Sequence, residues 1–285
     1  MAPLPRPFRL GTTSFIYPGM ILPNVERLGP VFDEIELLVF ESRPYQSISV
    51  LPSEADVVEL ARLGKALDLS YNIHLPVDVS LTHPEHRAEA VETLVRVVDL
   101  MAPLSPTAHA LHLPMDEALE NELRLHRGKE ALSGDLASAL ETWLNHARRG
   151  LDALLPQLDD PGCLSVETLD YPPEILYPLL AEYPVNLCLD VGHHFKYGFD
   201  GGAVLSEYRD RIPLIHLHGV EPRGEKIQDH VGLDRLDAPT RADFLPRLAD
   251  FTGTLSLEVF SLEHLNGSLA ALAPYFERIP PQLDA

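Results

Sequence analysis

Three features of the sequence predict a (β/α)8 barrel: short apolar runs alternate with longer amphipathic runs, eight such units follow one another, and no linker divides the 285 residues. Strict alternation of strands and helices is typical of a parallel sheet, and eight units close such a sheet into a barrel. The competing architecture is a doubly wound open sheet, but no glycine-rich phosphate loop follows the first apolar run. We therefore expect one TIM-barrel domain over residues 1–285.

The predicted strands are short, mostly apolar runs bounded by turn-forming residues. They cover Phe8–Phe15, Glu34–Glu41, Ser70–Pro76, Ala108–Pro114, Cys163–Leu169, Val185–Val191, Pro213–Gly219 and Thr254–Phe260.

The segments between these strands carry apolar residues at helical spacing. The clearest helical patterns lie at residues 53–68, where Ser53 is a candidate cap, and at 83–104, 133–158, 172–183, 239–251 and 264–279. The acidic segment from Met115 to Leu136, which follows Pro114, interrupts this alternation, and we predict an enlarged loop there.

Six strands end in a side chain that can bind a metal ion. Alternate residues of a barrel strand point inward, and the last inward residue reaches the catalytic mouth at the carboxyl ends of the strands. In five of the six, a small or modest residue stands two positions earlier, as a crowded barrel interior requires. These strand-end candidates are His74, His112, Glu167, Asp190, His216 and Glu258.

Three further candidates lie in loops just beyond the strands: His193 after the sixth strand, and the adjacent Asp229 and His230 after the seventh. Imidazoles with carboxylates and no thiolate are typical of Zn²⁺, Mn²⁺ or Fe²⁺ sites. A lone buried carboxylate such as Glu167 or Glu258 costs several kcal/mol unless it is compensated, and a metal ion would compensate it.

The other histidines have simpler interpretations. His83, His86, His126, His146 and His264 lie on or beside predicted helices. By strand alternation His109 points away from His112, toward the helix layer. His194 could contact a substrate or face solvent.

The formal net charge of −21 argues against nucleic acid as a partner, because such proteins rely on basic patches and no Lys/Arg cluster stands out. No run of about 18 apolar residues predicts a membrane span, and the N-terminus lacks the apolar segment of a secretory signal. Cys163 and Cys188 lie in strand-like runs, which is typical of buried thiols in a reducing compartment. We expect a cytoplasmic protein; the sequence leaves its oligomeric state open.

The order of these ligand candidates resembles the endonuclease IV branch of the xylose isomerase-like barrel superfamily. The match covers His74, His112, Glu167, Asp190 with His193, His216, the Asp229/His230 pair and Glu258. The resemblance implies that His74, His112 and Glu167 hold one divalent ion, that Glu167, Asp190, His216 and Glu258 hold a second, and that His193 and the loop pair hold a third. The family has one residue between its loop Asp and His, whereas Asp229 and His230 are adjacent, so the third site departs from the pattern.

The segment GTTSFIYPGMILPNVERLGPVFDEIELLVFES, with the later NIHLP, HLHG and QDHVGL, is similar to the cobamide-remodelling phosphodiesterases called CbiR, which are diverged relatives of endonuclease IV. This resemblance implies hydrolysis of the nucleotide loop of cobalamin-type corrinoids. It places the GTTSFIYP turn and Glu41 with Ser42 at the substrate cleft.

These observations favour a hydrolase that binds two or three divalent ions, with zinc or manganese preferred, and acts on a corrinoid phosphodiester. Glu167 or Glu258 would hold the attacking water, and His193 or Asp229 would assist proton transfer. A sugar isomerase or epimerase is the first competing function, because Glu167, Asp190, His216 and Glu258 form the quartet that those enzymes use; His74 and His112 argue against it. An endonuclease IV-like enzyme for abasic DNA and a metal-stabilised binding module are less favoured.

Overall fold

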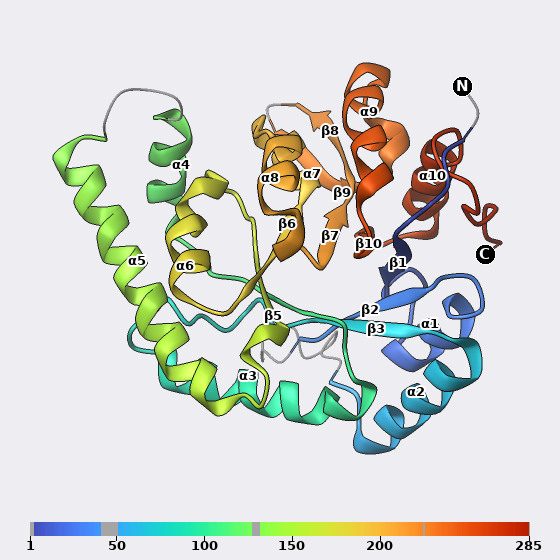
Figure 1. Cartoon of the computed structure of the whole chain (residues 1–285), viewed down its shortest axis with the longest axis horizontal. Coiled ribbons are helices and arrows are strands. Elements are labelled where there is room, and N and C mark those ends of the chain that lie inside the picture. Colours follow the sequence, from blue (N-terminus) through green and yellow to red (C-terminus); the bar gives the residue numbers. More distant parts are fainter. Residues whose placement is uncertain (1–2, 41–50, 127–131, 225, 285) are drawn as a thin grey trace.

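A computed structural model describes residues 3–40, 51–126, 132–224 and 226–284 and contains a closed barrel of eight parallel strands (Figure 1). The predicted fold class is confirmed. Each barrel strand lies inside a predicted one and is shorter: β1 (Arg9–Thr13), β2 (Glu34–Leu38), β3 (Ser70–His74), β4 (His109–Leu111), β5 (Leu164–Glu167), β6 (Asn186–Asp190), β7 (Leu214–Leu217) and β10 (Thr254–Leu257). The strands neighbour one another in chain order, and β1 pairs with both β2 and β10 to close the barrel.

The register of the strands supports the inward phase on which the mouth residues were predicted. His74 pairs with Ala110, Glu167 with Cys188, and Asp190 with His216. Small and modest side chains fill the interior below the mouth, where Ala108, Ala110, Cys188 and Leu214 form a buried apolar cluster. Because inward residues alternate, these fillers place the polar residues two positions later at the carboxyl ends of the strands.

Helices surround the barrel (Figure 1) and bury their apolar faces against its outer surface. They are α1 (Ile21–Leu28), α2 (Glu54–Leu67), α3 (Arg87–Met101), α4 (Glu117–Leu125), α5 (Gly134–Leu154), α6 (Tyr177–Glu182), α7 (Val191–Tyr197), α8 (Gly201–Tyr208), α9 (Ala238–Phe244) and α10 (Leu262–Leu272). The Ser53 side chain begins α2 as predicted, in a capping box with Asp56. Over the described parts of the chain, no helix combines the length and apolar character needed to cross a membrane.

The segment after β4 is more ordered than a loop. The prediction of an enlarged loop from Met115 to Leu136 is wrong for α4, which Asp116 caps by accepting from the backbone N–H groups of Ala118 and Leu119. The acidic residues that suggested a loop lie in the first turn of this helix, where they interact favourably with its dipole.

An antiparallel hairpin follows β7 and was not predicted. Strands β8 (Gly219–Arg223) and β9 (Lys226–Val231) pair with each other outside the barrel and pack against α7 (Figure 1). The hairpin places Asp229 and His230 on β9, beside the end of β7.

A fully buried carboxylate, Glu34, lies inside the barrel at the amino end of β2. It accepts hydrogen bonds from Ser70 Oγ (2.5 Å), Asn72 Nδ2 (2.9 Å), Thr107 Oγ1 (2.6 Å) and Thr254 Oγ1 (2.9 Å). These donors satisfy the buried charge and join β2 to β3, to the start of β4 and to β10.

Candidate metal centre

Strands β3, β4 and β5 bring three of the predicted ligands together at the mouth. His112 Nε2 lies 3.1 Å and His74 Nε2 3.4 Å from the same oxygen, Oε2 of Glu167. One ligand atom from each residue lies within 4.8 Å of the others, a spacing that one ion can bridge. We refer to this triplet as the first donor group.

His216 of β7 connects the first donor group to Glu258, which follows β10. Its Nδ1 lies 3.4 Å from Glu167 Oε1 and 3.3 Å from Glu258 Oε2. On its other side, Nε2 lies 3.1 Å from Oε1 of Glu36, whose second oxygen accepts a hydrogen bond from Ser256. Glu36 is fully buried and was not among the predicted residues.

Asp190, His193, His218 and His230 form a second donor group. Asp190 Oδ1 lies 3.3 Å from His218 Nε2, and its Oδ2 lies 3.4 Å from His193 Nε2. The His230 ring stacks on His218, with ring centroids 4.1 Å apart and an interplanar angle of 18°. His230 Nε2 lies 3.6 Å from Glu258 Oε2, so the two donor groups are neighbours.

Local backbone structure explains why these side chains meet. Asp190 caps α7 by accepting from the backbone N–H of His193, which holds both residues on the first turn. His230 has a left-handed backbone, with φ of 52°, and its N–H lies 3.0 Å from His218 Nδ1. The same Nδ1 lies 3.1 Å from the Gly219 carbonyl oxygen, which accepts its proton when Nε2 binds an ion. Gly192 leaves the space that the His218 ring occupies.

Asp229 lies beside the second donor group. Its Oδ1 is 3.3 Å from His230 Nδ1, while its Oδ2 forms a 2.6 Å ion pair with Lys196 of α7. The His230 contact, followed by Lys196, lowers the pKa of Asp229 far below its usual range despite partial burial. The Asp229 carboxylate therefore interacts with both a lysine and an imidazole.

The donor atoms suit divalent cations. The mouth combines buried carboxylates with imidazoles, and several of its atoms have no hydrogen-bond partner among the described residues. These atoms include Asp190 Oδ2, His218 Nε2, Glu258 Oε2, Glu36 Oε1 and both ring nitrogens of His216. Leaving such groups unsatisfied costs about 1–3 kcal/mol each, and a cation bound by carboxylate oxygen and imidazole nitrogen would satisfy them.

The electrostatics of the mouth are those of a negatively charged cluster. Burial alone lowers the pKa of His74, but the hydrogen bond and charge of Glu167 raise it to about 9. Burial also lowers the pKa of His193, but the charges of Asp190 and Asp170 raise it to about 9. Burial raises the pKa of Glu167, but the His112 and His216 charges hold it well below its usual range. In the metal-free protein, protons on histidine thus compensate the carboxylates.

Three residues at the mouth escaped the sequence analysis, and two of them carried a signal. His218 stands two positions after His216, in the inward phase, and Glu36 is an acid at an inward position of an apolar strand. Asp170, whose Oδ1 lies 2.6 Å from His193 Nδ1, sits in a loop and had no periodic signal.

Other predicted residues lie away from the mouth or outside the described residues. His109 is buried, and burial lowers its pKa to about 4. Neither interpretation of His194 fits, because its ring is buried edge-on against Phe199. Thr12 and Thr13 of the GTTSFIYP turn donate to backbone carbonyls of the β10 segment. Glu41 and Ser42 are outside the described residues.

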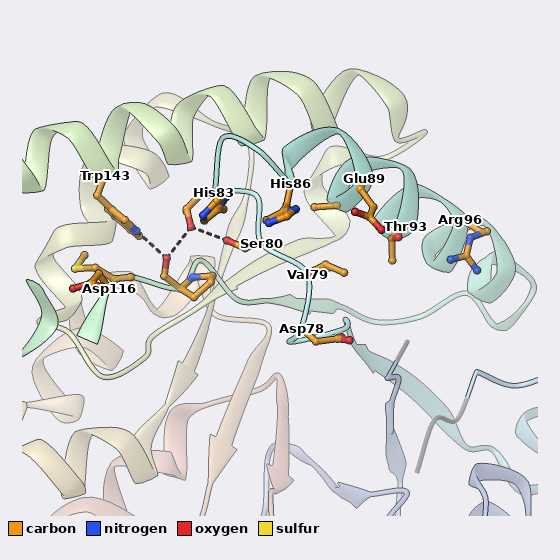
Figure 2. A pocket seen from close by; sticks show the side chains of 14 residues that line it. Asp78, Val79, Ser80, His83, His86, Glu89, Thr93, Arg96, Asp116 and Trp143 are labelled. Atoms are coloured by element: carbon orange, nitrogen blue, oxygen red, sulfur yellow. Dashed lines mark hydrogen bonds between the residues drawn. The ribbon is translucent and has the colours of Figure 1, made fainter. Parts of the chain in front are cut away.

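A cavity of about 1060 Å³ lies between α3 and the segments that follow β3 and β4 (Figure 2). Trp143 borders it and donates from Nε1 to the Pro114 carbonyl oxygen. His83 and His86 also line it, with ring centroids 4.8 Å apart. None of the described lining residues belongs to either donor group, so the cavity is separate from the metal-binding candidates.

Comparison with known proteins decides the family. Residues 22–277 match the family model described as "Xylose isomerase-like TIM barrel". The chain belongs to this family. No match was found among curated proteins.

Several solved structures resemble the chain over nearly its whole length. A D-tagatose 3-epimerase-like protein has a TM-score of 0.65 at 14% identity, covering 93% of this chain and 94% of its own. Endonuclease IV from Thermus thermophilus has a TM-score of 0.62 at 19% identity, covering 93% and 98%. The probable 3-DHS dehydratase AsbF from Bacillus anthracis has a TM-score of 0.64 at 15% identity, covering 93% and 97%. At these identities the likeness establishes the shared fold.

Proposed function

We propose that this chain is a metal-dependent phosphodiesterase that hydrolyses the nucleotide loop of cobamides. One observation carries the hydrolase assignment: the mouth holds two adjacent donor groups, which is more than a single ion requires. Structural and catalytic ions in proteins commonly take three or four protein ligands. Two or more ions a few Å apart are suited to in-line displacement at phosphorus.

In this proposal the first donor group, His74, His112 and Glu167, holds one ion. The second donor group, Asp190, His193, His218 and His230, holds another, with His218 added to the ligands that the sequence suggested. His216 and Glu258 lie between the two groups and could hold a third ion. Zinc or manganese fits this mixture of imidazole and carboxylate.

The bound ions would polarise the phosphoryl oxygens and stabilise charge on the departing oxygen. The chain's own residues would orient the attacking water and manage its proton. Glu167 and Glu258 face the space between the donor groups and are the proposed acceptors for that water. Of the two residues that the sequence suggested for proton transfer, His193 belongs to the second donor group and has a partner at each ring nitrogen. Asp229, an ionised carboxylate beside that group, is therefore the proposed proton acceptor.

Three observations support a bulky small molecule as substrate. The net charge of −21 opposes binding of a nucleic-acid backbone. The cavity between α3 and the segments that follow β3 and β4, at about 1060 Å³, has the size of a large small-molecule site (Figure 2). The sequence resemblance to cobamide-remodelling phosphodiesterases supplies the chemical identity.

A direct assay tests the proposal. Protein loaded with Zn²⁺ or Mn²⁺ is incubated with adenosylcobalamin, with a panel of ketoses and with abasic-site DNA, and the products are separated by chromatography. We expect release of the lower-ligand nucleoside or nucleotide from the corrinoid. An intact corrinoid beside an epimerised ketose would establish the epimerase function instead, and cleaved DNA would establish the endonuclease function.

A further inference from the structure

His193 has a partner on each side of its ring. Its Nε2 faces the second donor group, 3.4 Å from Asp190 Oδ2, and its Nδ1 lies 2.6 Å from Asp170 Oδ1. We propose that Asp170 is a positioning residue: its carboxylate accepts the Nδ1 proton of His193 and thereby directs the lone pair of Nε2 at an ion in the second donor group. This inference rests on the ion site of the proposed function but not on the substrate.

The chemistry of a metal-bound imidazole requires such a partner. One ring nitrogen gives its lone pair to the ion, so the other carries a proton that needs an acceptor. A carboxylate in this place fixes the tautomer and the ring orientation, and it makes the ligating nitrogen more basic. Asp170 occupies that place for His193.

Asp170 is itself held from three directions. The hydroxyl of Tyr197 donates to Oδ2 at 2.7 Å, and Lys196 Nζ lies 3.9 Å from the same oxygen. The guanidinium of Arg124 on α4 donates to the Asp170 backbone carbonyl and lies over the Tyr197 ring, 4.3 Å from its centroid. A side chain held in this way keeps its carboxylate aimed at Nδ1.

These contacts also distinguish positioning from direct ligation. Asp170 Oδ1 faces His193, and Oδ2 faces Tyr197 and Lys196, so both oxygens are engaged. Asp190, by contrast, is fully buried, and its oxygens lie 3.3 Å from His218 Nε2 and 3.4 Å from His193 Nε2, the nitrogens that face the second donor group. In this geometry Asp190 is the metal ligand, and Asp170 is the residue that orients His193.

Metal affinity measured on the full chain tests the role. The variants are Asp170→Ala, Asp170→Asn and Tyr197→Phe. Asp152→Asn is the matched control, because Asp152 also accepts from a tyrosine hydroxyl, that of Tyr183 at 2.9 Å, on another part of the surface. The Zn²⁺ content per chain and the affinity of each ion are measured by competition with a chelator, and Co²⁺ spectra report the ligand field.

We expect Asp170→Ala to weaken one ion by about 10–100-fold and to leave the remaining ions unchanged. Asp170→Asn keeps an acceptor for Nδ1–H, so its metal affinity should fall less than that of Asp170→Ala. The affinity of Tyr197→Phe should fall least of the three. The control should match the wild type. A purely structural role would lower thermal stability without a selective change in one ion or in the Co²⁺ spectrum.

Two results would overturn the inference. Wild-type affinity for every ion in a folded Asp170→Ala protein would remove the positioning role. Complete loss of one ion in both the Ala and the Asn variant would make Asp170 a ligand. Should Asp170→Ala fail to fold, Asp170→Asn and Tyr197→Phe still give the answer, since wild-type affinity in both contradicts the role. No substrate enters these measurements, so failure to cleave cobamides would leave their outcome intact.

Discussion

The imidazole of His218 occupies the space that a side chain on Gly192 would need: a Cβ at Gly192 would lie 2.0 Å from His218 Cε1 and 2.2 Å from both ring nitrogens. Gly192 lies in the first turn of α7, one residue before His193, so one glycine permits two histidines from different elements to approach Asp190. Residue 192 therefore affects the metal centre without contributing a donor atom.

Gly192→Ala should displace His218 from the second donor group. We expect one ion to be lost or strongly weakened, with a fall of about 1–3 kcal/mol in the free energy of unfolding from overpacking. Metal analysis and chemical denaturation measure the two effects. Gly134→Ala, at an open position of α5 with nothing within 4 Å, is the control and should leave both unchanged. Normal ion content in Gly192→Ala would contradict a ligand role for His218.

Two assignments of Asp229 predict different ion contents. As a ligand, which the sequence suggested, Asp229→Ala should remove an ion. The Lys196 ion pair and the His230 contact instead predict that Asp229→Ala keeps its full ion content with affinity weakened by about 10–100-fold. His230→Ala should lose the ion under either assignment and serves as the reference. Elemental analysis of the two purified variants distinguishes the assignments.

Metal binding should release protons. The pKa of His74 and of His193 is raised to about 9 in the metal-free protein, so both carry a proton at neutral pH that a ligating nitrogen must lose. Calorimetry of Zn²⁺ binding in buffers of different ionisation enthalpy measures this release. The His74→Ala variant should release about one proton fewer. A heat that is independent of the buffer would contradict the prediction.

The same pKa values set the pH dependence of the metal-free fold. A folded-state pKa raised from 6.5 to about 9 contributes stability that is fully present below pH 6.5 and is lost as the pH rises through about 9. We therefore expect the melting temperature of the metal-free protein to fall as the pH rises from about 7 to about 10. The metal-loaded protein should show a smaller decline, because its ions replace the protons. If the melting temperatures of the metal-free and metal-loaded proteins fall equally with pH, the histidines do not cause the pH dependence.

His112→Ala should reduce hydrolysis of a small chromogenic diester, bis(p-nitrophenyl) phosphate, and of adenosylcobalamin to the same extent. The loss of a first ligand should exceed the ~10–100-fold that loss of an outer contact costs. His126→Ala is a control, because His126 caps α4 with its Nδ1 2.8 Å from the Glu122 carbonyl oxygen. Unaltered turnover of both diesters by His112→Ala would remove the first donor group from the mechanism.

Strand periodicity carried most of the prediction. Alternation fixed the inward phase of His74, Glu167 and Asp190, because a barrel leaves only one set of positions facing its mouth. The same rule, applied one step further along β7 and to β2, also identifies His218 and Glu36. For the seventh strand only His216 was predicted as a ligand, although His218 stands two positions later in the same phase. Glu36 stands five residues before the end of its predicted strand and was therefore not counted among the strand-end candidates.

Contacts between elements that are distant in sequence could not be predicted from periodicity. Asp170 meets His193 only because the β5 loop folds toward α7, and no spacing in the sequence encodes that approach. The hairpin that presents His230 depends on a left-handed backbone at that residue, which a non-glycine position rarely signals. The helix α4 was missed because its acidic first turn resembles a solvated loop.

The hydrogen-bond network around Glu34 has a consequence for how this barrel can change. It joins strands at the end opposite to the metal-binding candidates, so its contribution to keeping the barrel closed is spatially separate from the chemistry. Loops at the mouth can accept insertions such as α4, and with them new substrates, without loosening that closure. A directed-evolution library for altered specificity should therefore randomise the carboxyl-end loops and leave Glu34 and its four donors untouched.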